Sequence, residues 1–292
     1  MKTEKNILIA FILNLSFSIM EIFMGMITKS YAIISDSVHD ICDAISILIS
    51  YFLEKISKRK PDNKYTFGYL RYSVLGGLIT TVILLVSSVI VIYHSIFRII
   101  NPVNIEYSKM IIFAIFGLIV NFIAAHITHG NDSINQRSVN LHMLEDVLGW
   151  AVVLVGAIIM KFTNLNILDP IMSIIISIYI FIHASRNFLV ILNLFLESTP
   201  KSIDINSLKD SLLTINGVID VHHIHVWSMD GVSNYLTMHV VNDNSNMNIK
   251  KDIRKMLHKN NIEHVTIELE DINESCIDHD CKIKSSHINH HH

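Results

Sequence analysis

Two histidine–aspartate pairs are the residues of this sequence best suited to chemistry. His39 and Asp43 are four positions apart, and so are His142 and Asp146. This spacing puts both members of a pair on one face of a helix, one turn apart. One imidazole and one carboxylate from each of two helices supply four ligands, which is the number and kind that a tetrahedral Zn²⁺ site uses. The pattern therefore predicts a metal site shared between two distant helices.

The surroundings of the two pairs strengthen this prediction. In a water-soluble protein, a hydrogen bond on the helix surface would explain each pair. Both pairs lie in apolar segments, however, where burying an ionisable group is costly and such a group is usually functional. Imidazole ligands favour Zn²⁺, with Cd²⁺ and Co²⁺ as further candidate ions.

The sequence leaves more than one role for each of three further acidic residues in the apolar segments. Asp40 either supports a ligand or carries protons, or it is a solvated charge in the cytoplasmic or external vestibule. Glu145 adjoins Asp146 but faces elsewhere, so we expect it to support the site or the helix packing and not to ligate. Glu21 lies deep in the first apolar segment, where it contacts a neighbouring helix, lines a proton path, or reaches towards the interface.

The composition indicates the kind of element that must position these residues. Hydrophobic residues make up 51% of the 292 positions and charged residues 17%, whereas a soluble domain is near 25% charged. The apolar surplus fills residues 6–195, which predicts an α-helical membrane protein. The net charge of −3 provides no basic footprint for nucleic acid.

Six apolar segments approach the roughly 20 residues that a helix needs to cross a bilayer. The expected spans are residues 6–28, 32–54, 72–97, 108–129, 138–160 and 169–191. The first is too long for a signal peptide and has no cleavage pattern, so we interpret it as a true span. The sequence thus predicts a multi-pass protein of a cell (inner or plasma) membrane, in contact with the lipid bilayer.

Basic residues predict the orientation. The loop 55–71 holds six lysines and arginines, and Lys2 and Lys5 precede the first span. By the positive-inside rule, both termini are then cytoplasmic. Three cysteines are too few for a disulfide framework, which agrees with a reducing compartment.

The remainder of the chain has the pattern of a small α+β domain. We expect a helix over 205–216, two strands about the Asp230–Gly231 turn, a helix near 247–261 and a last strand at "HVTIELE". Strict alternation in "VHHIHVW" would put His223 and His225 on one face and His222 on the other. The predicted organisation is a six-helix transmembrane domain over 1–198, a cytoplasmic domain over 199–275 and a Cys/His-containing tail over 276–292.

Several motifs resemble the cation diffusion facilitator family, in its zinc-transporting branch. They are "SDSVHDICDAISI", "YTFGYLRYSVLGGLI", "LHMLEDVLGW", "LESTP" and "VHHIHVW", in the family's order. The resemblance implies six transmembrane helices followed by a ferredoxin-like cytoplasmic domain, exchange of a divalent metal for protons (H⁺), and a homodimer joined through the cytoplasmic domain. It maps the transport site onto His39, Asp43, His142 and Asp146.

The resemblance also implies sites outside the membrane. His222, His239 and Glu270 correspond to regulatory metal positions, and Glu268 stands where some relatives have histidine. Cys276 and Cys281 have a loose spacing for a zinc pair, so they either bind metal or belong to a reducible tail. Arg71 and Glu197 either form a latch between the membrane part and the tail or are two solvated interfacial charges.

Two other classes of protein remain to be weighed. An intramembrane metalloenzyme would need an open metal position and a general base, but no His-Glu-x-x-His motif is present and four ligands leave no position open. A membrane metal sensor would use the tail as its output, although the tail has no recognisable kinase or DNA-binding element. We therefore predict a proton-coupled exporter of divalent metal, and not an enzyme.

Overall fold

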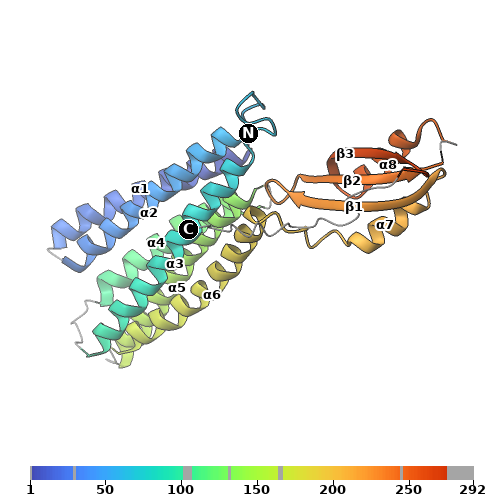
Figure 1. Ribbon diagram of the computed structural model, residues 1–292. Helices are drawn as coiled ribbons and strands as arrows, with labels where there is room; N and C mark the ends of the chain where they lie inside the picture. Colours follow the sequence, from blue (N-terminus) through green and yellow to red (C-terminus); the bar gives the residue numbers. More distant parts are fainter. Residues whose placement is uncertain are drawn as a thin grey trace, which may run out of the picture. The chain divides into compact units, whose positions relative to one another are not determined.

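A computed structural model describes residues 2–28, 31–100, 107–130, 133–163, 167–243 and 246–274. The chain separates into two compact units, residues 1–193 and 194–292. The first is a bundle of long helices and the second is a small α/β unit (Figure 1).

The first unit contains six long helices in its described part. They are α1 (Lys2–Thr28), α2 (Tyr31–Ser57), α3 (Arg71–Ile100), α4 (Tyr107–Thr128), α5 (Ile134–Thr163) and α6 (Leu168–Phe195). Within the described residues, five of these are long and apolar enough to cross a membrane, and α2 is the exception. The sequence of α2 accounts for this, because its first half holds Asp36, Asp40 and Asp43 and its end holds Glu54 and Lys55.

The surface and the interior of this bundle are the reverse of those in a soluble protein. Large apolar side chains such as Phe23, Ile112 and Phe162 are exposed, whereas serine, threonine and asparagine side chains are buried between the helices. Membrane helices pack in this way, since small and polar residues allow close approach and hydrogen bonding while lipid surrounds the apolar exterior.

The helix α3 approaches α5 closely at a pair of glycines. A Cβ atom added to Gly76 would lie 2.7 Å from Asn135 Oδ1, and one added to Gly77 would lie 3.0 Å from Ser138 Oγ. Further along, Asn187 of α6 donates to Thr81 Oγ1 at 2.9 Å and to Ser138 Oγ at 3.0 Å. Small residues and amide hydrogen bonds thus join α3, α5 and α6.

The second unit has the element order α-β-β-α-β, as expected from the sequence. Its elements are α7 (Ile205–Leu213), β1 (Val218–Ser228), β2 (Asn234–Asn242), α8 (Ile249–Lys259) and β3 (Ile262–Asp271). The sheet order is β1-β2-β3, with β1 and β2 antiparallel and β2 and β3 parallel. Apolar residues of α7 and α8 share one core with Val221, Leu236 and Met238 of the sheet, so both helices cover the same face.

The expected alternation of histidines in β1 is wrong because the strand contains a bulge. His222 pairs with His239 and His225 pairs with Thr237, so three steps along β1 face two steps along β2. The extra residue changes which face the following residues occupy. His222 and His225 therefore share the face opposite the helices, where strict alternation would have separated them.

Candidate metal sites

The first candidate site lies between α2 and α5. The Nε2 atom of His142 is 3.7 Å from Oδ2 of Asp43. Both residues are buried, with exposed fractions of 1% and 4%. The structure thus brings together one member of each histidine–aspartate pair, from two helices that are far apart in the sequence.

Apolar packing fixes the two helices beside this pair. Ile47 is one turn after Asp43 on α2, and it belongs to the same buried cluster as Val139 and Met143 of α5. Ile7 and Ala10 of α1 complete one side of the cluster. Because these side chains are fully buried, they hold α2 and α5 in the register at which Asp43 meets His142.

The structure describes the positions of Asp146 and Asp40 but not the side chain of His39. Asp146 is half-buried on α5, one turn after His142, and the helical spacing puts both on one face. Asp40 is half-buried on α2. The backbone of His39 belongs to α2, but its side chain lies outside what the structure describes. The four-ligand assignment therefore remains a prediction.

Glu145 is closer to the site than its sequence position indicated. Its Oε2 atom lies 3.9 Å from Nδ1 of His142, and its side chain is 16% exposed. The His142 imidazole is consequently flanked by a carboxylate at each nitrogen. A divalent cation among these groups would offset the charge of carboxylates that are costly to bury alone.

A second buried carboxylate, Glu54, was not singled out from the sequence. Its Oε2 atom accepts hydrogen bonds from Ser73 Oγ at 2.7 Å and from Ser133 Oγ and Asn135 Nδ2 at 3.3 Å each. Lys58 Nζ lies 3.9 Å from its Oε1 atom and 2.8 Å from Glu4 Oε1. Glu54 thus connects the end of α2 to α3 and to the start of α5. An acidic residue at the end of an apolar run is the signal that would have pointed to it.

The second candidate site lies on the open face of the sheet in the second unit. One ligand atom from each of His222, His239 and Glu270 lies within 4.8 Å of the other two. Glu270 Oε2 is 3.2 Å from His222 Nε2, and Glu270 Oε1 is 2.6 Å from His239 Nδ1. Two imidazoles and a carboxylate form a donor set that fits Zn²⁺ and leaves a fourth position for another ligand. We call these three residues the triad.

Carboxylates also lie at the outer nitrogens of the triad's histidines. Asp220 Oδ2 is 3.3 Å from His222 Nδ1, and Glu268 Oε2 is 3.4 Å from His239 Nε2. Partial burial would raise the pKa of Asp220, but the hydrogen bond and the charge of Lys209 outweigh it and hold that pKa below its ordinary value. Such partners fix the ring orientation and tautomer of a metal-binding histidine. Glu268, whose side chain is 68% exposed, is therefore better placed to orient His239 than to join the buried ligands.

Two further expectations are not settled by the structure. Cys276 and Cys281 lie outside the described residues. Arg71 belongs to the first compact unit and Glu197 to the second. A latch between them remains a prediction.

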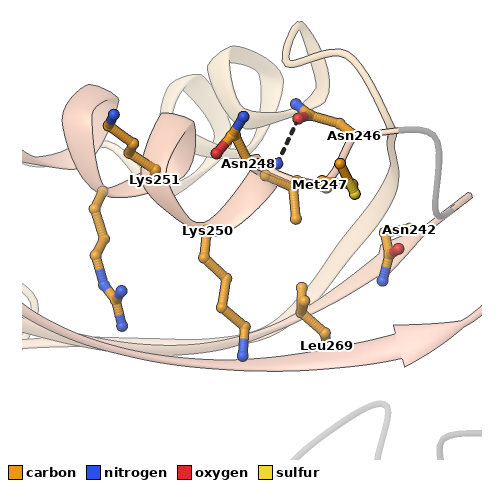
Figure 2. Close-up of a pocket in the computed structure, with 9 residues that line it drawn as sticks. Asn242, Asn246, Met247, Asn248, Lys250, Lys251 and Leu269 are labelled. Atoms are coloured by element: carbon orange, nitrogen blue, oxygen red, sulfur yellow. Dashed lines mark hydrogen bonds between the residues drawn. The ribbon is translucent and has the colours of Figure 1, made fainter.

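A pocket of about 480 Å³ at the start of α8 is separate from both sites (Figure 2). Asn242, Asn246, Asn248, Lys250 and Leu269 are among the residues that line it. Leu269 packs on the core side of the sheet, whereas Glu268 and Glu270 on either side of it point to the open face. Its lining residues are amide, basic or apolar, and none of those described is a histidine, cysteine or carboxylate of the kind that a metal site uses.

The fold and the first candidate site define a multi-pass integral membrane protein with a buried imidazole–carboxylate pair, and the comparisons with known proteins agree. Residues 7–196 match the cation efflux transmembrane domain, and residues 200–272 match the cation efflux protein cytoplasmic domain. The chain belongs to the cation efflux family, whose members are transporters and not enzymes.

Three relatives illustrate the extent of the similarity. The metal cation efflux system protein CzcD of Cupriavidus metallidurans is 32% identical, over 91% of this chain and 86% of its own. The zinc transporter ZitB of Yersinia pseudotuberculosis is 31% identical, over 99% and 96%. The cadmium, cobalt and zinc/H(+)-K(+) antiporter of Bacillus subtilis is 30% identical, over 91% and 89%. The likeness therefore covers both units.

Proposed function

We propose that this protein exports Zn²⁺ from the cytoplasm in exchange for protons. The ion is held during transport by His39, Asp43, His142 and Asp146, with Cd²⁺ and Co²⁺ as further substrates. The observation that carries this proposal is the 3.7 Å approach of His142 to Asp43 across the α2–α5 interface. The names of the zinc transporter and of the cadmium, cobalt and zinc antiporter among its relatives support the choice of metal.

The ligand set accounts for exchange with protons. A histidine binds metal only when its imidazole is neutral, and an aspartate binds best as a carboxylate, so a metal ion and protons compete for the same atoms. When the site faces the cytoplasm, binding of Zn²⁺ releases protons. When it faces a proton-rich outer side, protons displace the ion. An inward proton gradient then drives the metal outwards.

The triad supports a regulatory role for metal in the cytoplasmic unit. In this proposal, Zn²⁺ bound by His222, His239 and Glu270 stabilises a homodimer joined through this unit. Occupancy would rise with the cytoplasmic zinc concentration, so transport would accelerate when zinc is in excess. Both termini are cytoplasmic in this arrangement, and the membrane is the cell's inner or plasma membrane.

Transport by the purified protein in liposomes tests the transport proposal. A zinc-sensitive dye inside the vesicles should report Zn²⁺ entry when the vesicle interior is acidic, and entry should slow when the pH gradient is dissipated. His142→Ala should abolish this entry. His126→Ala is the matched control, because His126 is an exposed histidine at the end of α4.

Two outcomes would contradict the proposal. Zinc entry at the normal rate through a correctly inserted His142→Ala variant would remove the assigned site. Zinc binding without any flux by the unaltered protein would favour a membrane metal sensor instead.

A further inference from the structure

The bulge in β1 gathers histidines that the triad does not use. Thr237 and His239 point to the same face of β2, and their partners His225 and His222 point there with them. His223 occupies the bulge and has a left-handed φ of 52°. Bulges commonly redirect a side chain next to a functional site. In a strand without the bulge, the residue after His222 would point towards the core. The bulge allows the His223 ring to lie beside those of His225 and His239 instead.

The ring of His223 lies between two other imidazoles. Its centroid is 4.8 Å from that of His225, with the planes at 66°, and 4.8 Å from that of His239, with the planes at 20°. His239 already directs Nδ1 to Glu270 and Nε2 to Glu268. His223 and His225 therefore supply two adjacent imidazoles beyond the triad.

Exposure differs between this pair and the triad. His222 and Glu270 are buried, His223 is half-buried, and His225 is exposed. An ion could reach His225 and His223 from water without entering the triad. The two groups of ligands are thus neighbours on one face of the sheet with different access to solvent.

We propose that His223 and His225 form a second metal-binding site on the cytoplasmic unit, which takes a divalent cation such as Zn²⁺, Ni²⁺ or Cu²⁺. These are the ions that imidazole ligands suit, and water completes their coordination. The pair has no buried carboxylate, so it binds metal more weakly than the triad. This site goes beyond the proposed transport function and does not depend on it.

The pKa of His225 is compatible with this role. Partial burial of its ring lowers that pKa below the ordinary value, and the neighbouring imidazoles of His223 and His239 lower it further. A neutral imidazole keeps a lone pair available to a metal ion.

Counting bound Zn²⁺ on the full-length protein in detergent tests the proposal. Equilibrium dialysis at saturating Zn²⁺ should find one ion fewer per chain in His223→Asn/His225→Gln than in the unaltered protein. Asparagine is chosen because it tolerates the left-handed conformation. Residues 275–292 are the same in every variant, so the histidines and cysteines there cancel from the difference.

Matched variants make the result specific. His264→Asn removes another exposed histidine from the same face of the sheet, beside Tyr235, and should leave the count unchanged. His239→Ala removes a triad ligand and should also lower the count by one. If the double variant folds poorly, His225→Gln alone replaces an exposed residue and should weaken the second, weaker binding step by about tenfold or more.

Two results would overturn the proposal. Equal counts in the unaltered protein and the double variant would mean that the pair holds no ion. A combined variant of His223, His225 and His239 that loses no more metal than His239→Ala would mean that the pair and the triad form one site.

Discussion

His142 Nε2 lies 3.7 Å from Asp43 Oδ2, although one residue belongs to α5 and the other to α2. Both are buried, and the cluster containing Ile47 and Met143 holds their helices together beside them. A cation bound between them would contact both side chains, so their contributions to its binding should depend on each other.

A double-mutant cycle measures that dependence. Asp43→Asn and His142→Gln should each weaken Zn²⁺ binding by at least about tenfold. The affinity of the combined variant should be only slightly lower than that of the single variant that binds Zn²⁺ less tightly. Residues that share one partner are not additive. Titration calorimetry of the purified protein gives the four affinities. Additive effects, like those expected for His142→Gln combined with a change at the exposed His126, would mean that the pair does not share an ion.

The elements of this site could be predicted from the sequence because two strong signals coincide. Helical spacing identified His142 and Asp146, and the apolar context made their charge notable. The contact of His142 with Glu145 could not be predicted in the same way. Residues three and four positions on from a histidine are both its neighbours, so spacing alone did not decide which carboxylate approaches which nitrogen.

Features that depend on non-local partners were missed. Glu54 coincided with the predicted end of a span, whereas α2 continues to Ser57 and the hydrogen-bond donors to Glu54 come from other segments. The bulge at His223 was missed because alternation assumes one residue on each strand per step. A single extra residue invalidates that assumption for every residue after it.

Glu145 should tune the affinity of the transport site through His142. Its carboxylate lies 3.9 Å from Nδ1, so when an ion binds at Nε2 it would stabilise the proton that stays on Nδ1. Glu145→Gln should weaken Zn²⁺ binding by roughly tenfold, without the complete loss expected from His142→Ala. Titration calorimetry with Zn²⁺ compares the affinities of the purified Glu145→Gln and His142→Ala variants. Glu4→Gln is the control, since Glu4 pairs with Lys58, and an equal loss in that variant would assign the effect to the stability of the bundle.

Glu54 should stabilise the bundle. Glu54→Ala removes the acceptor of hydrogen bonds from Ser73, Ser133 and Asn135 and leaves buried donors without it. Hydrogen bonds to charged groups contribute about 1.5–3 kcal/mol each, so we expect a loss of about 2 kcal/mol or more in the free energy of unfolding. Glu54→Gln keeps an acceptor and should cost less. Thermal unfolding in detergent measures both, and equal stability of Glu54→Ala and the unaltered protein would contradict the role.

The start of α7 should make the cytoplasmic unit sensitive to acid. Asp204 caps this helix, and the hydrogen bond from the Ser207 backbone N–H lowers the pKa of its carboxyl below the ordinary value. The charged form is therefore favoured in the folded state. Its contribution to stability is complete above the unfolded pKa of about 3.9 and is lost as the pH falls through the lower folded pKa.

Fluorescence of Trp227 can follow this unit separately, because the chain has two tryptophans and Trp150→Phe removes the one in α5. In that background, Asp204→Asn should keep a capping side chain but lose the part of the acid sensitivity that belongs to Asp204. An unchanged dependence of unfolding on pH below 4 would contradict the assignment.

The triad should couple zinc to association of the cytoplasmic unit. His222 and Glu270 are buried, and His239 Nδ1 lies 2.6 Å from Glu270 Oε1, so a metal ion would replace this close contact and draw three side chains from three strands together. Added Zn²⁺ should therefore shift the full-length protein towards the dimer, and His239→Ala should reduce that shift by about tenfold in the association constant. Analytical ultracentrifugation in detergent measures the shift, with His264→Asn as the control on the same sheet face. A zinc-dependent shift of equal size in His239→Ala would show that zinc promotes the dimer without the triad. Metal bound by the triad would then not contribute to dimerisation.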